Sequence, residues 1–220
     1  VMDEKIKPRD VRKRVLRYGR NIALSEDRLV LTAETDGHVT LVEDKVFVSN
    51  VFEVENVDNS TGNIEYDGSV KVNGNVCTNF SIKAKGNIEV SGVVEGAVLE
   101  AEGNIIIARG MNGMAKGVLK AGGNVISKFI ESSKVTAGGY VSTESILHSE
   151  VSAGTEITVS GKRGFVTGGR VAAANLISVK TLGSSMGADT IVEVGMDPAK
   201  KERMQELQKR IAENNKELEQ

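Results

Sequence analysis

The sequence has few of the residues that stabilise small secreted domains or fill a broad core. It has one cysteine, Cys77, which excludes an intrachain disulfide framework and a zinc site built from several thiolates. It has no tryptophan and two prolines, and aromatic residues make up 4% of the chain. Because large rings normally fill a broad core, this scarcity favours a narrow core of Val, Ile and Ala.

Charge of one sign is also lacking, since the net charge is −2 over 220 residues. It therefore gives no general reason to expect binding to nucleic acid or an anionic membrane. No apolar run resembles a signal peptide or could cross a bilayer, so we expect a cytoplasmic protein. The chain starts at Val1 and stops within a charged helical pattern, so we expect a piece of a longer protein.

A local cluster of basic residues stands near the start. We interpret residues 1–16 as a solvated basic arm or linker, and a partner-binding arm is the alternative. The cluster consists of Lys5, Lys7, Arg9, Arg12, Lys13, Arg14, Arg17 and Arg20, against the single Asp10.

Glycine is plentiful, with 24 residues, and it marks an internal repeat. Ala-Lys-Gly-Asn-Ile at 84–88 recurs as Ala-Glu-Gly-Asn-Ile at 101–105, with related segments at 66–70, 121–125, 137–141, 153–157 and 167–171. The copies end at 70, 88, 105, 125, 141, 157 and 171, at intervals of 18, 17, 20, 16, 16 and 14. A repeat of this length indicates a solenoid, and its variable interval argues against a strict six-residue repeat.

Within each copy the hydrophobic pattern has period two. Ile82 and Ala84 alternate with Lys83 and Lys85, which is typical of a strand with one buried face. These strands are too closely spaced for hairpins, so each should pair with its counterpart one coil later, about 4.8 Å away. The sequence predicts an all-β fold, a right-handed single-stranded parallel β-helix (β-solenoid) over residues 61–195, with the hand taken from the general preference.

Glycine and asparagine should form the corners. Gly removes the Cβ where the chain bends or packs closely. Asn follows Gly at Asn75, Asn87, Asn104 and Asn124. We expect these side chains to tolerate left-handed backbone and to hydrogen-bond along a stack.

The flanking segments differ from the repeat. Residues 17–60 predict a small N-terminal β region that caps the solenoid, with strands near 21–24, 29–33, 38–42 and 46–48. Residues 197–220 predict the start of a coiled-coil helix, opened by Asp197 and Pro198. Its apolar seam would consist of Met204, Leu207, Ile211 and Leu218, with Asn214 between the last two. We expect it to pair with itself, with a second helix or with the solenoid side.

Residues that could carry chemistry are scattered. Neither His38 nor His148 has a second ligand nearby in sequence, and Gly161-Lys162 lacks the spacing of a phosphate loop. A catalytic triad assembled by the fold stays open. We therefore assign no catalytic, cofactor-binding or metal-binding residue. We interpret the glutamates of the repeat as solvated surface residues, unless equivalent positions stack in a column. They are Glu89, Glu95, Glu100, Glu102, Glu131, Glu144, Glu150 and Glu156.

One coil carries an insertion at residues 109–117, with two Met and three Gly. We read it as a long loop, with partner binding as the alternative.

Several segments resemble the flagellar assembly protein A family. They include Gly68-Ser69-Val70 and Gly74-Asn75-Val76, and the stretches 94–97, 146–151, 168–173, 182–184 and 190–195. The resemblance implies a bacterial cytoplasmic protein with a β-solenoid core and a coiled-coil extension. It also implies a role through protein–protein contacts, in flagellar assembly in some bacteria. It supplies no catalytic or cofactor residues.

The sequence leads to one preferred function and two alternatives. The preferred one is a non-enzymatic scaffold or adaptor that binds protein partners, such as flagellar assembly or regulatory proteins, without nucleic acid, cofactor or membrane insertion. It could form a homo-oligomer through the C-terminal helix. The alternatives are a polymer-forming cytoskeletal β-helix protein and a carbohydrate-active β-helix enzyme.

Overall fold

The computed structural model describes residues 16–35, 37–162, 164–195, 203–204 and 207–211. The chain divides after Asn50 into two compact units, each described here by itself. The predicted basic arm at 1–16 lies almost wholly outside the described residues. Within those residues, no helix has the length and apolarity needed to cross a membrane.

The first unit consists of short strands. Strand β2 (Ile22–Leu24) pairs antiparallel with β3 (Leu31–Ala33), and β4 (His38–Val42) pairs antiparallel with β5 (Lys45–Ser49). Strand β1 (Arg17–Tyr18) runs parallel to β5. The β4–β5 turn uses Glu43 and Asp44, both with positive φ, as a two-residue hairpin requires. The predicted strands are confirmed, and capping of the solenoid by this unit stays a prediction.

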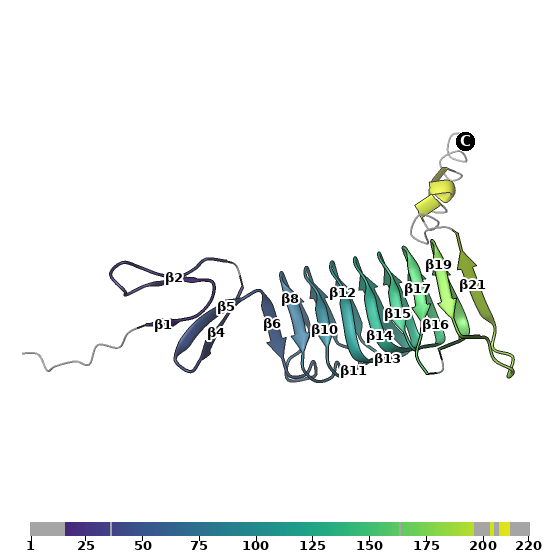
Figure 1. Ribbon diagram of the computed structural model, residues 1–220, viewed down its shortest axis with the longest axis horizontal. Coiled ribbons are helices and arrows are strands. Elements are labelled where there is room, and N and C mark those ends of the chain that lie inside the picture. Colours follow the sequence, from purple (N-terminus) through teal and green to yellow (C-terminus); the bar gives the residue numbers. More distant parts are fainter. Residues whose placement is uncertain (1–15, 36, 163, 196–202, 205–206, 212–220) are drawn as a thin grey trace, which may run out of the picture. The chain divides into compact units, whose positions relative to one another are not determined.

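The second unit is a parallel β-solenoid of eight coils, seen as a row of stacked strands in Figure 1. Each coil contributes to three faces, and the first two coils contribute only isolated bridges, at Val57 and Val76, to the second face. The first face contains β6 (Val51–Val54), β8 (Ser69–Val72), β10 (Ile88–Val90), the starts of β13 (Ile105–Ala121) and β14 (Val125–Ala137), β15 (Val141–Thr143), β17 (Glu156–Val159) and β19 (Leu176–Val179).

The other two faces are built in the same way, by parallel pairing from coil to coil. The second face contains β11 (Val93–Glu95), the middle of β13 and β14, the starts of β16 (Ser145–Ala153) and β18 (Phe165–Ala173), and β20 (Thr181–Leu182). The third face contains β7 (Ile64–Tyr66), β9 (Ser81–Ala84), β12 (Val98–Ala101), the ends of β13, β14, β16 and β18, and β21 (Thr190–Val194). The predicted coil-to-coil pairing is therefore confirmed, whereas the right-handed sense stays a prediction.

The solenoid begins ten residues earlier than the sequence predicts. Phe52 pairs with Val70, so β6 is the first strand of the first coil and the boundary lies at 51 rather than 61. The Gly-containing motif is missing before Phe52, where Ser49-Asn50 stands. Within this unit no coil lies beneath the first one, so a Cβ at this position would meet no neighbouring coil and glycine is not required.

The last copy of the predicted repeat is out of register. Val171 pairs with Val151 and Val192 on the third face, and the true counterpart of Ile157 is Ile177. The pair Gly168-Gly169 misled the alignment because it serves a different corner. Both glycines have positive φ there, at 70° and 85°, whereas the motif glycines of the earlier copies are needed for close packing.

The core consists of columns of inward side chains. Val70, Ile88, Ile105, Val125 and Val141 form one column on the first face and are at most 1% exposed. The second face adds a fully buried column of Val94, Met111, Ile130, Ile146 and Val166. Aliphatic columns of this width leave little space for aromatic rings, as the composition indicates.

Asparagines bind each coil to the next. The Asn87 Oδ1 accepts a hydrogen bond from the backbone N–H of Asn104, and the Asn104 Oδ1 accepts one from Asn124, both at 2.8 Å. Asn75 belongs to a separate column at another corner, above Asn56. These hydrogen bonds confirm the predicted stack. The predicted left-handed backbone is wrong, because none of the four asparagines has positive φ.

One row of left-handed residues lies at the corner between the second and third faces. Asn79, Gly96, Ser132, His148 and Gly168 all have positive φ there. This corner turns sharply with one or two left-handed residues per coil, and their types are mixed, so the sequence repeat did not reveal them.

The C-terminal segment is helical at residues 203–204 and 207–211. The predicted coiled coil is not supported by this short stretch. Met204, Leu207 and Ile211 are exposed, while Asn214 and Leu218 lie outside the described residues.

Each Asn of the column requires a Gly in the next coil. A Cβ built on Gly123 would lie 2.5 Å from the Asn104 Oδ1. We expect Gly123→Ala to lower the free energy of unfolding by about 1–3 kcal/mol, as overpacking does. Urea denaturation would measure this cost. In an Asn104→Ala background the clashing oxygen is gone, so the same substitution should cost clearly less, and equal costs in both backgrounds would contradict the close-packing account.

Candidate functional site: a charged trough on the third face

Outward side chains of alternating charge stack on the third face. Glu65 pairs with Lys83, Lys83 with Glu100, and Glu100 with Lys120, after which Thr136 ends the alternation. A second column alongside consists of Asp67, Lys85 and Glu102. Since coils lie about 4.8 Å apart, charges of like sign in a column are about 9.6 Å apart. We call this surface the charged trough.

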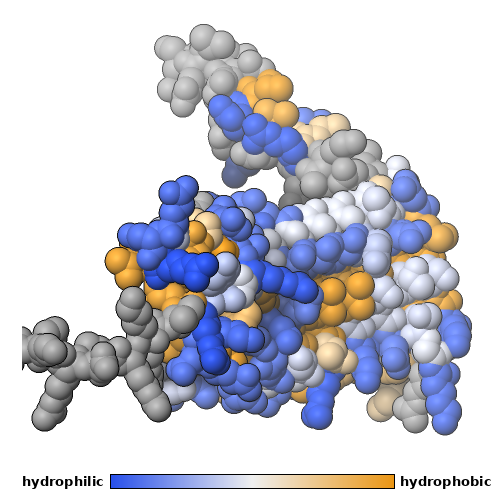
Figure 2. Space-filling model, turned by 60° about the vertical axis from the view of Figure 1, so that its left-hand side comes forward, coloured by the Kyte–Doolittle hydropathy of each residue, from blue (hydrophilic) through white to orange (hydrophobic). Residues whose placement is uncertain are grey.

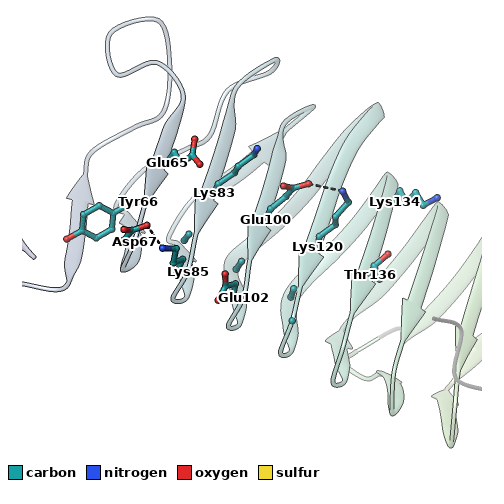
Figure 3. A pocket seen from close by; sticks show the side chains of 14 residues that line it. Glu65, Tyr66, Asp67, Lys83, Lys85, Glu100, Glu102, Lys120, Lys134 and Thr136 are labelled. Atoms are coloured by element: carbon teal, nitrogen blue, oxygen red, sulfur yellow. Dashed lines mark hydrogen bonds and ion pairs between the residues drawn. The ribbon is translucent and has the colours of Figure 1, made fainter. Parts of the chain in front are cut away.

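The trough is an open depression with a volume of about 710 Å³. Its charged side chains project on one side of successive strands (Figure 3). Its lining residues are Glu65, Tyr66, Asp67, Lys83, Ala84, Lys85, Glu100, Ala101, Glu102, Lys120, Ala121, Gly122, Lys134 and Thr136.

Ion pairs join neighbouring coils in and beside the trough. The Lys120 Nζ lies 2.8 Å from the Glu100 Oε1, and the Lys85 Nζ lies 2.9 Å from the Asp67 Oδ1 (Figure 3). Further along this face, the Arg170 Nη2 lies 2.7 Å from the Glu193 Oε2. Opposite charges directly across parallel strands stabilise the register modestly.

These contacts keep the trough ionised. The hydrogen bond from Lys120 holds the pKa of Glu100 below its usual value, and the positive charges of Lys120 and Lys83 act in the same direction. The hydrogen bond to Asp67, assisted by its negative charge, raises the pKa of Lys85. The trough therefore presents fixed charges to anything that approaches it at neutral pH.

Acid–base chemistry on sugars needs a different arrangement. A glycosidase pairs two carboxylates and holds one of them protonated by raising its pKa. Glu100 and Glu102 project on the same face two residues apart, but Lys120 shifts the pKa of Glu100 in the opposite direction. Glu65 and Glu100 are separated by Lys83. The stacked acidic column that would favour an enzyme is thus interrupted by lysines.

The remaining sequence candidates are dispersed. His38 lies on β4 in the first unit, and His148 is exposed at a corner of the solenoid, next to Gly168. Cys77 is half-buried rather than buried, because it follows the inward Val76 and points outward. Within the described part of the chain, no three of His, Cys, Asp and Glu come together to hold a metal ion.

The inserted segment at 109–117 is part of β13, not a detached loop. Asn112 pairs with Glu131, and Gly117 pairs with Ser133 in the next coil. Four residues lie between the paired positions in β13 and one lies between them in β14, so β13 has three extra residues that bulge outward. Met111 is fully buried, whereas Met114 is exposed. The Lys116 Nζ donates a 2.7 Å hydrogen bond to the Asn79 Oδ1, which ties the bulge to an earlier coil.

Sequence analysis missed the alternating column, although its signal was present. Glu65, Lys83, Glu100, Lys120 and Thr136 each stand three residues before the Gly of a repeat copy. Comparing the outward positions of the aligned copies, and not only their glycine and apolar positions, shows the alternation of charge.

The fold defines the class of this protein as a parallel β-solenoid with charged and apolar outward columns. The chain belongs to the flagellar assembly protein A β-solenoid domain family, which matches residues 50–220. The match begins where the structure begins the second unit, and it confirms the family resemblance. Searches of curated proteins and of solved structures found no match.

The Glu100–Lys120 pair predicts a small pH effect. A lowered folded-state pKa adds stability above the unfolded pKa of about 4.5, and this stability is lost as the pH falls through the folded pKa. We expect Glu100→Gln to lower the free energy of unfolding by less than about 1 kcal/mol at pH 7, because both side chains are partly exposed.

Urea denaturation at pH 7 and at about pH 3 would measure the difference from the wild type, which should shrink as the pH falls. Glu156→Gln is the matched control, because Glu156 is exposed and no ion pair is recorded for it within the described residues. A difference that persists unchanged in acid would contradict the ion-pair account.

Proposed function

We propose that this chain is a non-enzymatic cytoplasmic scaffold or adaptor that binds protein partners on the outer faces of its solenoid. The family is named for flagellar assembly. We therefore propose partners among flagellar assembly or regulatory proteins.

The observation that carries this proposal is the fixed register of outward charges in the trough. Residues distant in sequence, such as Glu65 and Lys120, are held three strands apart in one outward column of the same sheet. Binding of a partner with a complementary row of charges costs little conformational entropy on this surface, because the coils already fix the positions of these residues. The face of the molecule seen in Figure 2 carries hydrophilic and hydrophobic side chains interspersed.

The lysine contacts support the non-enzymatic part of the proposal. Lys120 favours the ionised form of Glu100, so this carboxylate is poorly suited to donate a proton near neutral pH. The trough is also open, with none of the enclosure that excludes water from a reacting bond.

A pull-down of the tagged full-length protein from its own host tests the scaffold function. We expect reproducible protein partners, and we expect Lys83→Glu with Lys85→Glu to reduce their recovery severalfold by making the trough predominantly acidic. Lys45→Glu with Lys116→Glu is the matched control, because it changes the same charge at exposed positions outside the trough. The absence of any reproducible partner for the wild type would contradict the proposal.

A polymer-forming protein is the second candidate, favoured by the last coil. Its inward positions Leu182 and Val194 are 53% and 54% exposed, whereas their counterparts Val166 and Ala173 one coil earlier are buried. Strand β21 pairs with β18 alone among the described strands, so its other edge is available. Uncovered inward side chains and an unpaired edge are the features by which solenoids stack end to end.

Sedimentation at increasing concentration tests this second candidate. End-to-end assembly predicts a steady growth of the mean particle mass, and Val194→Lys should abolish it by placing a charge on the exposed end. Ser178→Lys is the control, since Ser178 is exposed on the outward side of the same coil. A small oligomer of constant size at high concentration would exclude polymerisation.

A further inference from the structure

Two phenylalanines stand on the outside of the solenoid, one above the other. Phe129 pairs with Ser145, and Ser145 pairs with Phe165, in the outward column of the second face. They account for two of only five phenylalanines in the chain. Their inward neighbours Ile130 and Val166 are fully buried, which fixes the outward direction of both rings. Both rings are half-buried, so part of each ring is accessible to a partner at matched outward positions.

The small residue between the rings leaves a groove. Phe129 and Phe165 are two coils apart, about 9.6 Å along the stack, and Ser145 fills little of this interval. The ring of Phe129 lies over Gly110, since a Cβ there would stand 2.5 Å from the Phe129 Cδ1. The ring thus rests on the preceding coil and leaves the space beside Ser145 open. A cavity of about 320 Å³ lies between these side chains.

Charged side chains line one side of the same cavity. Lys128 precedes one ring and Lys162 precedes the other, and Glu144 lies between them. The Glu144 carboxylate packs over Gly161, with Oε2 3.1 Å from where a Cβ would stand on that glycine. Among the described residues no ion pair is recorded for either lysine, in contrast to Lys85 and Lys120 of the trough. The groove therefore combines two aromatic rings with two ammonium groups and a net charge of +1.

The depth of the groove decides what kind of ligand it fits. A small-molecule site encloses most of its ligand, whereas this cavity is shallow and open to solvent. A single aromatic side chain between two rings fills such a groove, and the rest of a partner chain can bury the surrounding surface. Leu147, the half-buried outward neighbour of Ser145, extends the apolar area in that direction.

We propose that the Phe129–Phe165 groove binds a partner-protein segment that inserts an aromatic side chain between the two rings and places adjacent carboxylates against Lys128 and Lys162. Both lysines precede the rings in their coils. The acidic residues of the partner segment should therefore lie on one side of its aromatic residue. This proposal rests on the proposed scaffold function and names the chemistry of one partner segment.

Fluorescence titration of the full chain tests the groove. The protein has no tryptophan, so an acetylated Asp-Asp-Trp-Gly-Ser peptide reports its own binding without background. We expect a saturable change in its emission. Phe165→Ser should weaken binding about tenfold, the scale of one lost aromatic contact. Ser already occupies this column at Ser145, so the variant should still fold, with an unfolding midpoint somewhat below that of the wild type because Phe165 is half-buried.

Charge variants and control probes complete the test. Lys128→Ala with Lys162→Ala should weaken binding severalfold and flatten its salt dependence, whereas Lys83→Ala with Lys85→Ala in the trough should leave it unchanged. The charge-reversed peptide Lys-Lys-Trp-Gly-Ser should bind more weakly than the acidic one.

Three results would overturn the groove proposal. They are no saturable binding up to about 1 mM peptide, equal binding by Phe165→Ser and the wild type, and displacement of the peptide by adenosine monophosphate, which would indicate a small-molecule site. Each of these leaves the host pull-down unaffected. Failure of the pull-down with the wild type would instead contradict the scaffold function itself.

Discussion

Parallel pairing between successive coils is the constraint on which the rest of this structure depends. Each strand hydrogen-bonds to its counterpart about 4.8 Å away, so every side chain stands directly over its equivalent in the coil below. Inward columns must then be aliphatic and closely packed. At one corner the column of Asn87 and Asn104 satisfies backbone N–H groups, and it requires glycine in the coil above because the amide oxygen occupies the space of a Cβ.

The same register determines the surfaces available for binding. On the third face it places acidic and basic side chains in alternation, so that most of their charge is compensated between neighbouring coils. On the second face it sets two phenylalanines either side of a serine. In a solenoid, the residues at one outward position of successive coils therefore form a column with a fixed pattern on the surface.

Prediction from the sequence succeeded where the repeat is regular and failed at its ends. The positions Val70, Ile88, Ile105, Val125, Val141 and Ile157 follow from the glycine motif and prove to be one column. Phe52 was missed because a first coil needs no glycine. Val171 was misplaced because two glycines required for left-handed backbone resemble the motif. The charged trough could have been found from the same alignment, whereas the aromatic groove could not, because the spacing between Phe129 and Phe165 includes a corner of irregular length.

The sequence by itself determined the strands, the narrow aliphatic core and the stacking of coils, because hydrophobic alternation and glycine spacing are local and repeat within each coil. Only the tertiary structure decided which outward residues are neighbours across corners of irregular length. The coils differ in length at these corners, so Phe165 lies two coils above Phe129 although no regular spacing in the sequence indicates it. The outward surfaces of this protein depend on such cross-coil distances, which the register of the whole stack sets.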